Sequence, residues 1–368
     1  MGGAAPRPYS TGAGTWSESQ DSLFTARPSL TVRTSAAWSP PSLRYDPSTV
    51  QSALSALLRM PQRDTDAHRY DVVTLARQAL TNRSRALLPQ IQEAYGAKDL
   101  ARFRTLTARW KSDMALLDSL LATDSRYLLG PWLAAAKPWG MEFDARSIIT
   151  TWGHRSGSDA GGLHDYAARE LAGLTADFHL MRWTKYFDSL DTALSTGTAP
   201  ASIDWFAVED AWNRSTKAYP LQPAGDPYAV ATKVRDSLPA VPVGAVTGVG
   251  GMCLDITAGN SSDGTQVQLY SCNGTPAQTW SFYDDTAVRA LNKCLDIRNG
   301  GVTAGTPVQI WECNDSAAQK WRAHPDGTLR NPTSGMCLDA EGGSSAAGTR
   351  LLIWHCHGGP NQRWTTPR

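Results

Sequence analysis

No apolar run in the 368 residues approaches the length needed to cross a bilayer, so the sequence does not predict a membrane protein. The formal net charge is only +1, and the charges of both signs are spread along the chain. Such a balance gives no basis for a nucleic-acid or anionic-membrane partner. Residues 1–22 are rich in Gly, Ala, Ser and Pro and lack the apolar core of a signal peptide.

Cysteine is absent before residue 253, and the six cysteines that follow form three pairs, each separated by 19 residues. A zinc site would need cysteines a few residues apart with four converging on one point, so we expect no metal and no cofactor. The economical interpretation is one disulfide per pair, each contributing roughly 3 kcal/mol to stability. The predicted pairs are Cys253–Cys272, Cys294–Cys313 and Cys337–Cys356.

Because the cytosol is reducing, three disulfides predict a secreted or extracellular protein. This prediction conflicts with the missing signal peptide. Either secretion uses another route, or the true N-terminus lies upstream of this sequence.

The cysteine pairs belong to a threefold internal repeat with a period of 41 and then 43 residues, typical of a small all-β unit. Each copy opens on Cys-Leu-Asp and passes a Gly-Thr turn. A short apolar strand then ends in an aromatic residue and the second cysteine, and the copy closes on Gln-x-Trp. The closing pairs are Gln278 and Trp280, Gln319 and Trp321, and Gln362 and Trp364.

This pattern resembles the ricin-B-type β-trefoil lectin, which also occurs as a carbohydrate-binding module on secreted bacterial glycosidases. The resemblance covers about residues 244–368. It implies that the tryptophans of Gln-x-Trp, namely Trp280, Trp321 and Trp364, are core residues rather than ligand contacts.

The same resemblance implies a sugar site elsewhere in each repeat. An apolar sugar face would stack on the aromatic residue, while a carboxylate and an amide bind adjacent hydroxyls. The candidate residues are Asp255, Gln268 and Tyr270 in the first repeat, Asp296, Gln309 and Trp311 in the second, and Asp339, Trp354 and Asn361 in the third.

No repeat carries the full set of site residues. Ala277 and Ala318 stand where the lectins have Asn, and Leu352 stands where they have Gln. The aspartates have an alternative role as acceptors for turn N–H groups. We expect the third site to bind best, because its carboxylate and amide can share one hydroxyl pair.

Residues 42–219 show helical periodicity with few alternating β-branched runs, which predicts an all-α domain. One apolar stripe begins at Tyr70, and Asp99 is placed to cap a second helix. A third stripe is interrupted near Gly130-Pro131, a long fourth runs from Leu163 to Met181, and a fifth covers residues 203–219. A short amphipathic piece after Pro227 then leads into a linker.

No chemistry stands out in this helical part. Its histidines lack the i, i+4 pairing of a metal-binding helix, and no two carboxylates form an evident acid and base pair. Trp152, which precedes a Gly-rich loop between two helices, is a plausible pocket wall.

Several motifs in one order resemble the C-terminal helical domain of α-N-acetylglucosaminidases, the family 89 glycoside hydrolases. They are Arg27-Pro-Ser-Leu30, Asp124-Ser-Arg-Tyr-Leu-Leu-Gly130, Thr151-Trp-Gly153, Asp165-Tyr-Ala167, Glu170-Leu-Ala-Gly-Leu174 and Arg182-Trp183. That family carries its catalytic glutamates on a (β/α)8 barrel before the helical domain, and nothing in this sequence corresponds to the barrel. The resemblance therefore implies no catalytic residue here, and a substrate-pocket wall at Trp152, Leu163 and Tyr166.

The predicted architecture is a multidomain α and β protein: a flexible segment (1–21), an all-helical domain (22–238), a linker (239–249) and a β-trefoil lectin domain (250–368). We expect the chain to bind carbohydrate, a glycan or polysaccharide, without its own catalytic barrel. One alternative is an α-N-acetylglucosaminidase completed by an upstream or separate barrel. A second is a two-domain lectin or adhesin with a helical spacer.

Overall fold

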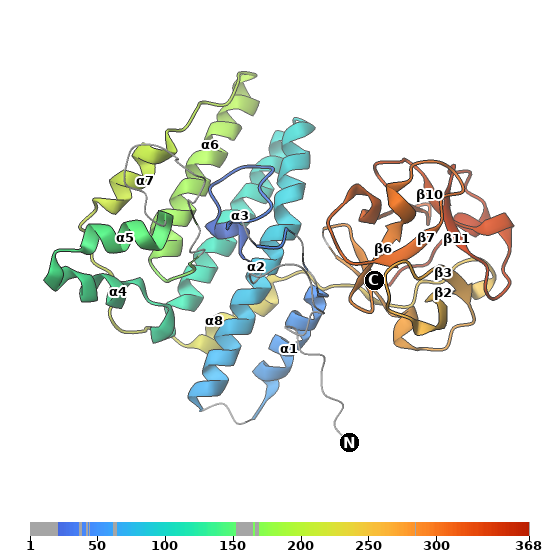
Figure 1. The fold of residues 1–368 in the computed structure, drawn as a ribbon, viewed down its shortest axis with the longest axis horizontal. Coiled ribbons are helices and arrows are strands. Elements are labelled where there is room, and N and C mark those ends of the chain that lie inside the picture. Colours follow the sequence, from blue (N-terminus) through green and yellow to red (C-terminus); the bar gives the residue numbers. More distant parts are fainter. Residues whose placement is uncertain are drawn as a thin grey trace. The chain divides into compact units, whose positions relative to one another are not determined.

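The computed structural model describes residues 21–36, 39–41, 43, 45–61, 65–151, 165, 169–283 and 285–367. These residues form two compact units, one helical and one built of strands (Figure 1). The helical unit ends at Pro239, and the strand unit takes up the chain from Ala240 onwards together with a short segment around Asp46.

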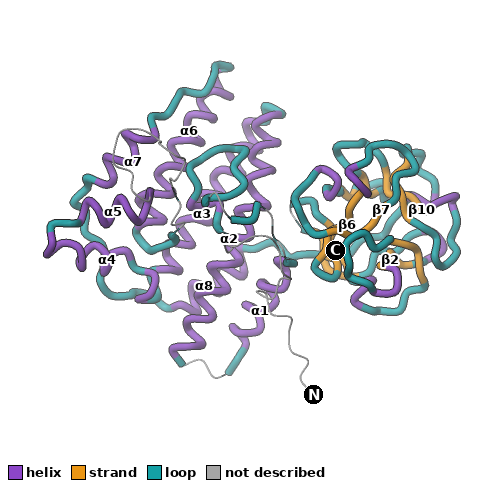
Figure 2. The backbone as a smooth tube through the Cα atoms, viewed as in Figure 1, coloured by secondary structure: helices purple, strands orange, loops and turns teal. Residues whose placement is uncertain are grey.

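The helical unit consists of helices and loops, whereas the strands lie in the other unit (Figure 2). Its helices are α1 (Pro47–Arg59), α2 (Asp66–Gly96), α3 (Leu100–Leu121), α4 (Leu129–Ala136), α5 (Glu142–Thr151), α6 (Leu180–Thr196), α7 (Trp205–Asn213) and α8 (Pro227–Ser237). Within the described residues, none of these helices has the length and apolar character that crossing a bilayer requires.

Local side chains start the two longest helices. Thr65 accepts a hydrogen bond from the His68 N–H at the beginning of α2, and Asp99 accepts one from the Arg102 N–H at the beginning of α3. Each bond satisfies a backbone donor that has no partner within the helix. The cap predicted at Asp99 is therefore confirmed.

The buried faces of α2, α3 and α6 pack around large aromatic side chains. The Trp110 and Trp183 rings lie 4.4 Å apart between centroids, and Phe24 meets Trp110 edge-on at 4.8 Å. All three side chains are buried. Phe24 comes from the segment before α1, so this segment contributes to the core of the helical unit.

The prediction of one long helix from Leu163 to Met181 is wrong between residues 169 and 173, because Ala172 pairs in a parallel bridge with Leu128. Gly173 then adopts a positive φ of 91°, and a π-helical turn (Thr175–His179) leads into α6. Asp118 accepts the Gly173 and Ala176 N–H groups, which satisfies this new helix start.

The helix expected over residues 203–219 is shorter, since α7 spans Trp205–Asn213. The amphipathic piece expected after Pro227 is the helix α8. Pro227 is its first residue, where the fixed φ suits a helix start and the missing N–H costs nothing, and Asp226 caps it.

The strand unit has the threefold organisation that the repeat predicts. Its strands are β1 (Val243–Gly244), β2 (Cys253–Ile256), β3 (Val267–Tyr270), β4 (Trp280–Phe282), β5 (Val288–Ala290), β6 (Lys293–Ile297), β7 (Val308–Trp311), β8 (Arg322–Ala323), β9 (Leu329–Arg330), β10 (Cys337–Ala340) and β11 (Leu351–Trp354). In each repeat the Cys-Leu-Asp strand pairs antiparallel with the strand that ends in the aromatic residue.

The three repeats close on one another through their Gly-Thr turns. The Gly264 N–H donates to Ile310 O in the second repeat, the Gly305 N–H to Ile353 O in the third, and the Gly348 N–H back to Leu269 O in the first. Each repeat thus completes the backbone hydrogen bonding of the next, and their apolar faces share one core.

The disulfides are Cys253–Cys272, Cys294–Cys313 and Cys337–Cys356, the pairs predicted from the spacing. Each joins the Cys-Leu-Asp strand to the cysteine two positions after the aromatic residue that ends the partner strand. The Cys residue that opens a repeat lies directly across the ladder from the aromatic residue, as in the pair Cys253 and Tyr270.

Candidate functional site

The Gln-x-Trp motif builds the frame on which each candidate sugar site stands. Trp280, Trp321 and Trp364 are buried, as predicted, and each indole N–H donates to the carbonyl of the Leu in its own Cys-Leu-Asp. The indole therefore fixes the strand that carries the Asp. Its buried polar group is satisfied at the same time.

The Gln of the same motif holds the Asp side chain directly, a role that the sequence analysis did not assign. Gln319 Nε2 donates to Asp296 Oδ2 at 3.1 Å and to Glu312 O at 3.0 Å, and its Oε1 accepts the Asn314 N–H. Gln278 and Gln362 make the equivalent contacts in the other repeats. The aspartates are thus oriented by side-chain amides, and the signal for this was the recurring Gln itself.

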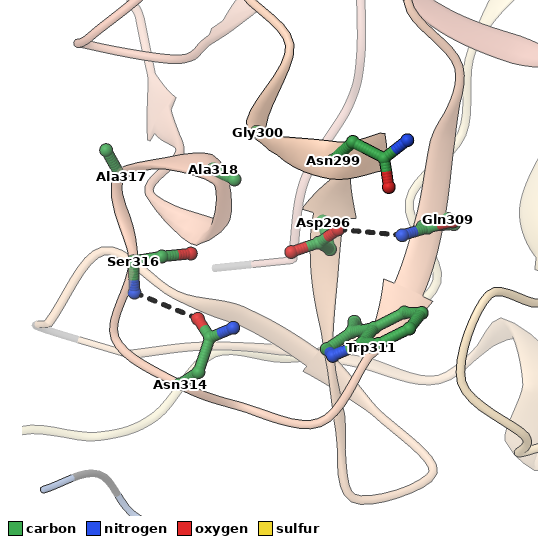
Figure 3. Close-up of a pocket in the computed structure, with 9 residues that line it drawn as sticks. All are labelled: Asp296, Asn299, Gly300, Gln309, Trp311, Asn314, Ser316, Ala317 and Ala318. Atoms are coloured by element: carbon green, nitrogen blue, oxygen red, sulfur yellow. Dashed lines mark hydrogen bonds between the residues drawn. The ribbon is translucent and has the colours of Figure 1, made fainter.

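In the first two repeats a second Gln also donates a hydrogen bond to the Asp carboxylate. Asp255 lies opposite Gln268 in the strand register, and Gln268 Nε2 donates to Asp255 Oδ1 at 2.9 Å. Asp296 and Gln309 repeat this arrangement at 3.0 Å (Figure 3). Each carboxylate oxygen keeps one lone pair for a ligand hydroxyl.

The aromatic residues lie on the same outer face as these glutamines, two positions further along the strand. Tyr270 and Trp311 are 43% and 41% exposed, whereas Asp255 and Asp296 are 5% exposed. An exposed ring beside a recessed carboxylate and amide matches the needs of a sugar, which has an apolar face and hydroxyl edges.

A pocket opens over each of these two clusters. The first has a volume of about 600 Å³ and the second about 380 Å³. The second is lined by Asp296, Asn299, Gly300, Gln309, Trp311, Asn314, Ser316, Ala317 and Ala318 (Figure 3). Sequence analysis missed Asn299 and Asn314, which lie on turns outside the repeated motifs.

The third repeat holds its carboxylate differently, because Leu352 stands opposite Asp339. Asn361 Nδ2 and Gln362 Nε2 both donate to Asp339 Oδ2, at 2.8 and 2.7 Å. Among the described residues none donates to Oδ1, which leaves that oxygen for a ligand. Trp354 is 43% exposed beside it.

In the second site a further carboxylate acts on Asp296. Burial raises the pKa of Asp296, hydrogen bonds from Gln309 and Gln319 oppose this, and the nearby Asp263 carboxylate raises it further. Asp263 is itself held by Lys293 at 2.8 Å and accepts the Glu312 N–H. Arg298 Nε donates to Gln309 Oε1 and so fixes which end of the amide faces Asp296.

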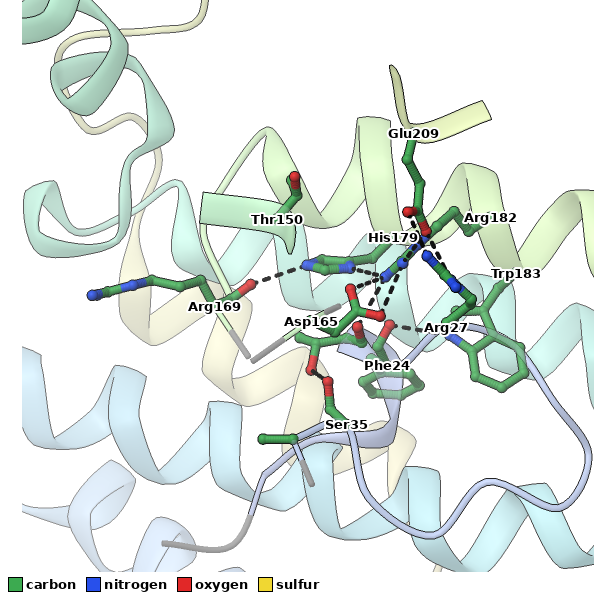
Figure 4. A network of polar contacts seen from close by, with 12 residues as sticks. Phe24, Arg27, Ser35, Thr150, Asp165, Arg169, His179, Arg182, Trp183 and Glu209 are labelled. Atoms are coloured by element: carbon green, nitrogen blue, oxygen red, sulfur yellow. Dashed lines mark hydrogen bonds and ion pairs between the residues drawn. The ribbon is translucent and has the colours of Figure 1, made fainter. Parts of the chain in front are cut away.

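The helical unit contains a separate buried polar network centred on Arg182, which is fully buried (Figure 4). Its guanidinium contacts Asp165 at 2.8 Å, Glu209 at 2.9 Å and the Thr25 carbonyl at 2.9 Å. Arg27 adds a two-point contact to Glu209. The network thus ties the segment before α1 to α6, α7 and Asp165.

His179 belongs to the same network as a neutral ring. Its Nε2 lies 3.1 Å from the Arg169 carbonyl, which can only accept, so Nε2 carries the proton. Its Nδ1 then accepts from Arg182. Burial, and next the Arg182 charge, lower the pKa of His179 to about 3.

Comparison with known proteins assigns both units. Residues 6–237 match the family model of the α-N-acetylglucosaminidase (NAGLU) C-terminal domain, and residues 242–364 match the ricin-type β-trefoil lectin domain. The first match covers more than half of the chain. The chain belongs to the α-N-acetylglucosaminidase C-terminal domain family. It carries a ricin-type lectin domain after that domain, as the sequence motifs indicated.

The human α-N-acetylglucosaminidase is 32% identical in an alignment of 223 residues that covers 56% of this chain and 28% of the human protein. A family 89 glycoside hydrolase from Clostridium perfringens, solved with its substrate GlcNAc-α-1,4-galactose, superposes with a TM-score of 0.56 at 27% identity. The superposed region covers 59% of this chain and 26% of the Clostridium perfringens chain. The same hydrolase in complex with PUGNAc gives the same TM-score at 28% identity. The chain therefore spans little more than a quarter of the length of these relatives.

The pocket wall predicted for the α-N-acetylglucosaminidase domain, Trp152, Leu163 and Tyr166, lies outside the described residues. Asp165, which directly precedes Tyr166 in the sequence, is described and is held by Arg182. The other carboxylates of this domain are mostly engaged structurally. Asp113 contacts Arg83 and Arg109, and Glu170 contacts Arg77 at 2.5 Å.

Proposed function

We propose that the chain is a carbohydrate-binding protein in which the trefoil binds neutral sugars through its repeats. The observation that carries this proposal is the recurring cluster of a recessed, amide-held carboxylate beside an exposed ring. The proposed contacts are Asp255, Gln268 and Tyr270, then Asp296, Gln309 and Trp311, then Asp339, Trp354 and Asn361. We also propose that the protein works outside the cell, since its three disulfides suit an oxidising compartment.

Truncation of the exposed rings tests this proposal. Each of Tyr270→Ala, Trp311→Ala and Trp354→Ala should weaken binding to a neutral polysaccharide by about 1–3 kcal/mol at its own site, because the stacking surface is lost. The melting temperature should remain near that of the wild type, since these rings are exposed. Affinity electrophoresis on a polysaccharide gel gives the measurement.

The relative size of the three losses ranks the sites. A dominant loss for Trp354→Ala would support the carboxylate and amide pair of the third repeat as the main site. A triple variant that binds like the wild type would contradict sugar binding at these clusters.

A second candidate function rests on the family. We propose that the helical domain completes an α-N-acetylglucosaminidase active site when a glycosidase barrel is supplied by another segment or another chain. Trp152, Leu163 and Tyr166 are then its proposed substrate-pocket wall, and the Arg182 contacts with Asp165 hold the residue next to Tyr166. A role as a plain two-domain adhesin is the remaining alternative.

The isolated chain should show no turnover of an aryl α-N-acetylglucosaminide above buffer. Glycoside hydrolysis needs two carboxyl groups that flank the bond, and each buried carboxylate described in the helical domain is paired with an arginine. A continuous assay of released aryl alcohol measures this. Clear turnover that one Asp or Glu substitution within residues 22–238 abolishes would make the helical domain itself an enzyme.

A further inference from the structure

The pockets of the first and second repeats share one frame but differ in their walls. Both contain the Asp, the Gln, the aromatic residue and an Asn at matching positions. The first pocket has the larger volume, about 600 Å³ against about 380 Å³ for the second. Two replacements and one addition make its wall more apolar: Ala258 stands in place of Asn299, Pro276 stands in place of Ala317, and Leu291 joins the lining.

Leu291 reaches this pocket from outside the repeated motifs, after Trp280 and before Cys294. It lies in the two-residue loop between β5 and β6, where Ala290 pairs with Lys293. Leu291 and Asn292 have φ angles of 51° and 61°, the conformation of a turn that favours Asn-Gly. A bulky Leu is unfavourable there.

The contacts of the Leu291 side chain outside the turn offset this unfavourable backbone conformation. It is half-buried, packs against the trefoil core and lines the first pocket. The corresponding loop for the second pocket runs from Asn331 to Met336, between β9 and β10, and none of its residues lines that pocket within the described part of the chain. The apolar wall is therefore a property of the first pocket and does not follow from the repeat pattern.

From these differences, and resting on the proposed function of the trefoil as a sugar-binding domain, we propose that the first pocket selects N-acetylated hexosamines. The pyranose ring would stack on Tyr270 and direct hydroxyls to Asp255 and Gln268, as in the second pocket. The acetamido methyl group would lie against Leu291, Pro276 and Ala258. The second pocket offers the polar Asn299 at that place and gives no such gain.

Burying one methyl group favours binding about fourfold. We therefore expect the first pocket to bind N-acetylglucosamine and N-acetylgalactosamine about three- to tenfold more tightly than glucose and galactose. The full chain carrying Trp311→Ala and Trp354→Ala isolates this pocket, since only Tyr270 then remains as a stacking ring. Isothermal titration with each sugar measures the preference.

Two further substitutions in that background locate its cause. Leu291→Ala removes the apolar wall, and a melting curve of the variant checks that the fold tolerates the loss of the Leu291 contacts with the core. Ala258→Asn installs the residue of the second pocket, and Asn299 already adopts the same backbone conformation, with φ of 55° against 56° for Ala258. Each should bring the affinities for N-acetylated and parent sugars to within about twofold of each other.

The outcomes separate this proposal from the one it rests on. Equal affinity for N-acetylated and parent hexoses, or a preference that survives both substitutions, would overturn the acetamido selectivity while sugar binding stands. An equal gain for the 6-deoxy sugar fucose would overturn the assignment to an acetamido group. No binding of any of these sugars to the wild-type chain would overturn both proposals.

Discussion

Arg182→Met should lower the free energy of unfolding of the helical domain by about 3–5 kcal/mol, the largest effect that we expect from one substitution. Arg182 is fully buried between Asp165 and Glu209, which are themselves 2% and 0% exposed. The Met side chain fills the space of the stem but leaves both carboxylates in a buried site with less compensation. Urea unfolding followed by helical circular dichroism at 222 nm measures the loss, because the helices lie in this domain.

Arg104→Ala is the matched control for a surface ion pair. Arg104 makes a two-point contact to Asp191, but the two side chains are 57% and 31% exposed. Solvent screens such pairs, so the expected loss of stability is small beside that of Arg182→Met. Equal stabilities of the two variants would contradict a structural role for the Arg182 network.

The helical domain should also lose stability as the pH falls below 6.5. Burial and the Arg182 charge hold the pKa of His179 at about 3, whereas an unfolded His titrates near 6.5. The neutral ring therefore contributes its full stability above pH 6.5, and this contribution is lost progressively between pH 6.5 and 3. At about 1.4 kcal/mol per pH unit, the loss from pH 6.5 to 5 is about 2 kcal/mol.

His179→Gln separates this titration from that of other groups. Its amide can donate to Arg169 O and accept from Arg182, as the neutral ring does, but it cannot take up a proton. Burial raises the pKa of Asp21, Asp113 and Asp118, and these groups act in the opposite direction at the acid end. The difference between wild type and variant above pH 5 is thus the quantity to measure, and parallel stability curves would contradict the assignment to His179.

The trefoil was predictable because the same sequence motif occurs three times. Three copies of one pattern fix the disulfide partners, the hairpins and the buried tryptophans, since each feature depends on residues within about 30 positions of each other. The walls of the pockets were not predictable. Leu291 lies between two copies of the motif and lines the pocket of the first, and no spacing rule connects it to Asp255.

In the helical domain, the long amphipathic stretches and the Asp99 cap were visible locally, but the ends of the later helices were not. The break at residues 169–173 depends on pairing with Leu128 and on the carboxylate of Asp118, both distant in sequence. The contact between Arg27 and Glu209 joins residues 182 positions apart. A single sequence gives no signal for such pairs, because each residue is an ordinary surface charge in its local pattern.

The most direct test of the proposed function is a titration of the isotope-labelled chain with N-acetylglucosamine, observed through its side-chain N–H signals by NMR. We predict that the side-chain amides of Gln268 and Gln309 and the indole of Trp311 shift and saturate at millimolar sugar. The indole N–H signals of the buried Trp280, Trp321 and Trp364, each hydrogen-bonded to a Leu carbonyl, should not shift. Unchanged Gln268, Gln309 and Trp311 signals at sugar concentrations on the order of tens of millimolar would contradict sugar binding by this trefoil.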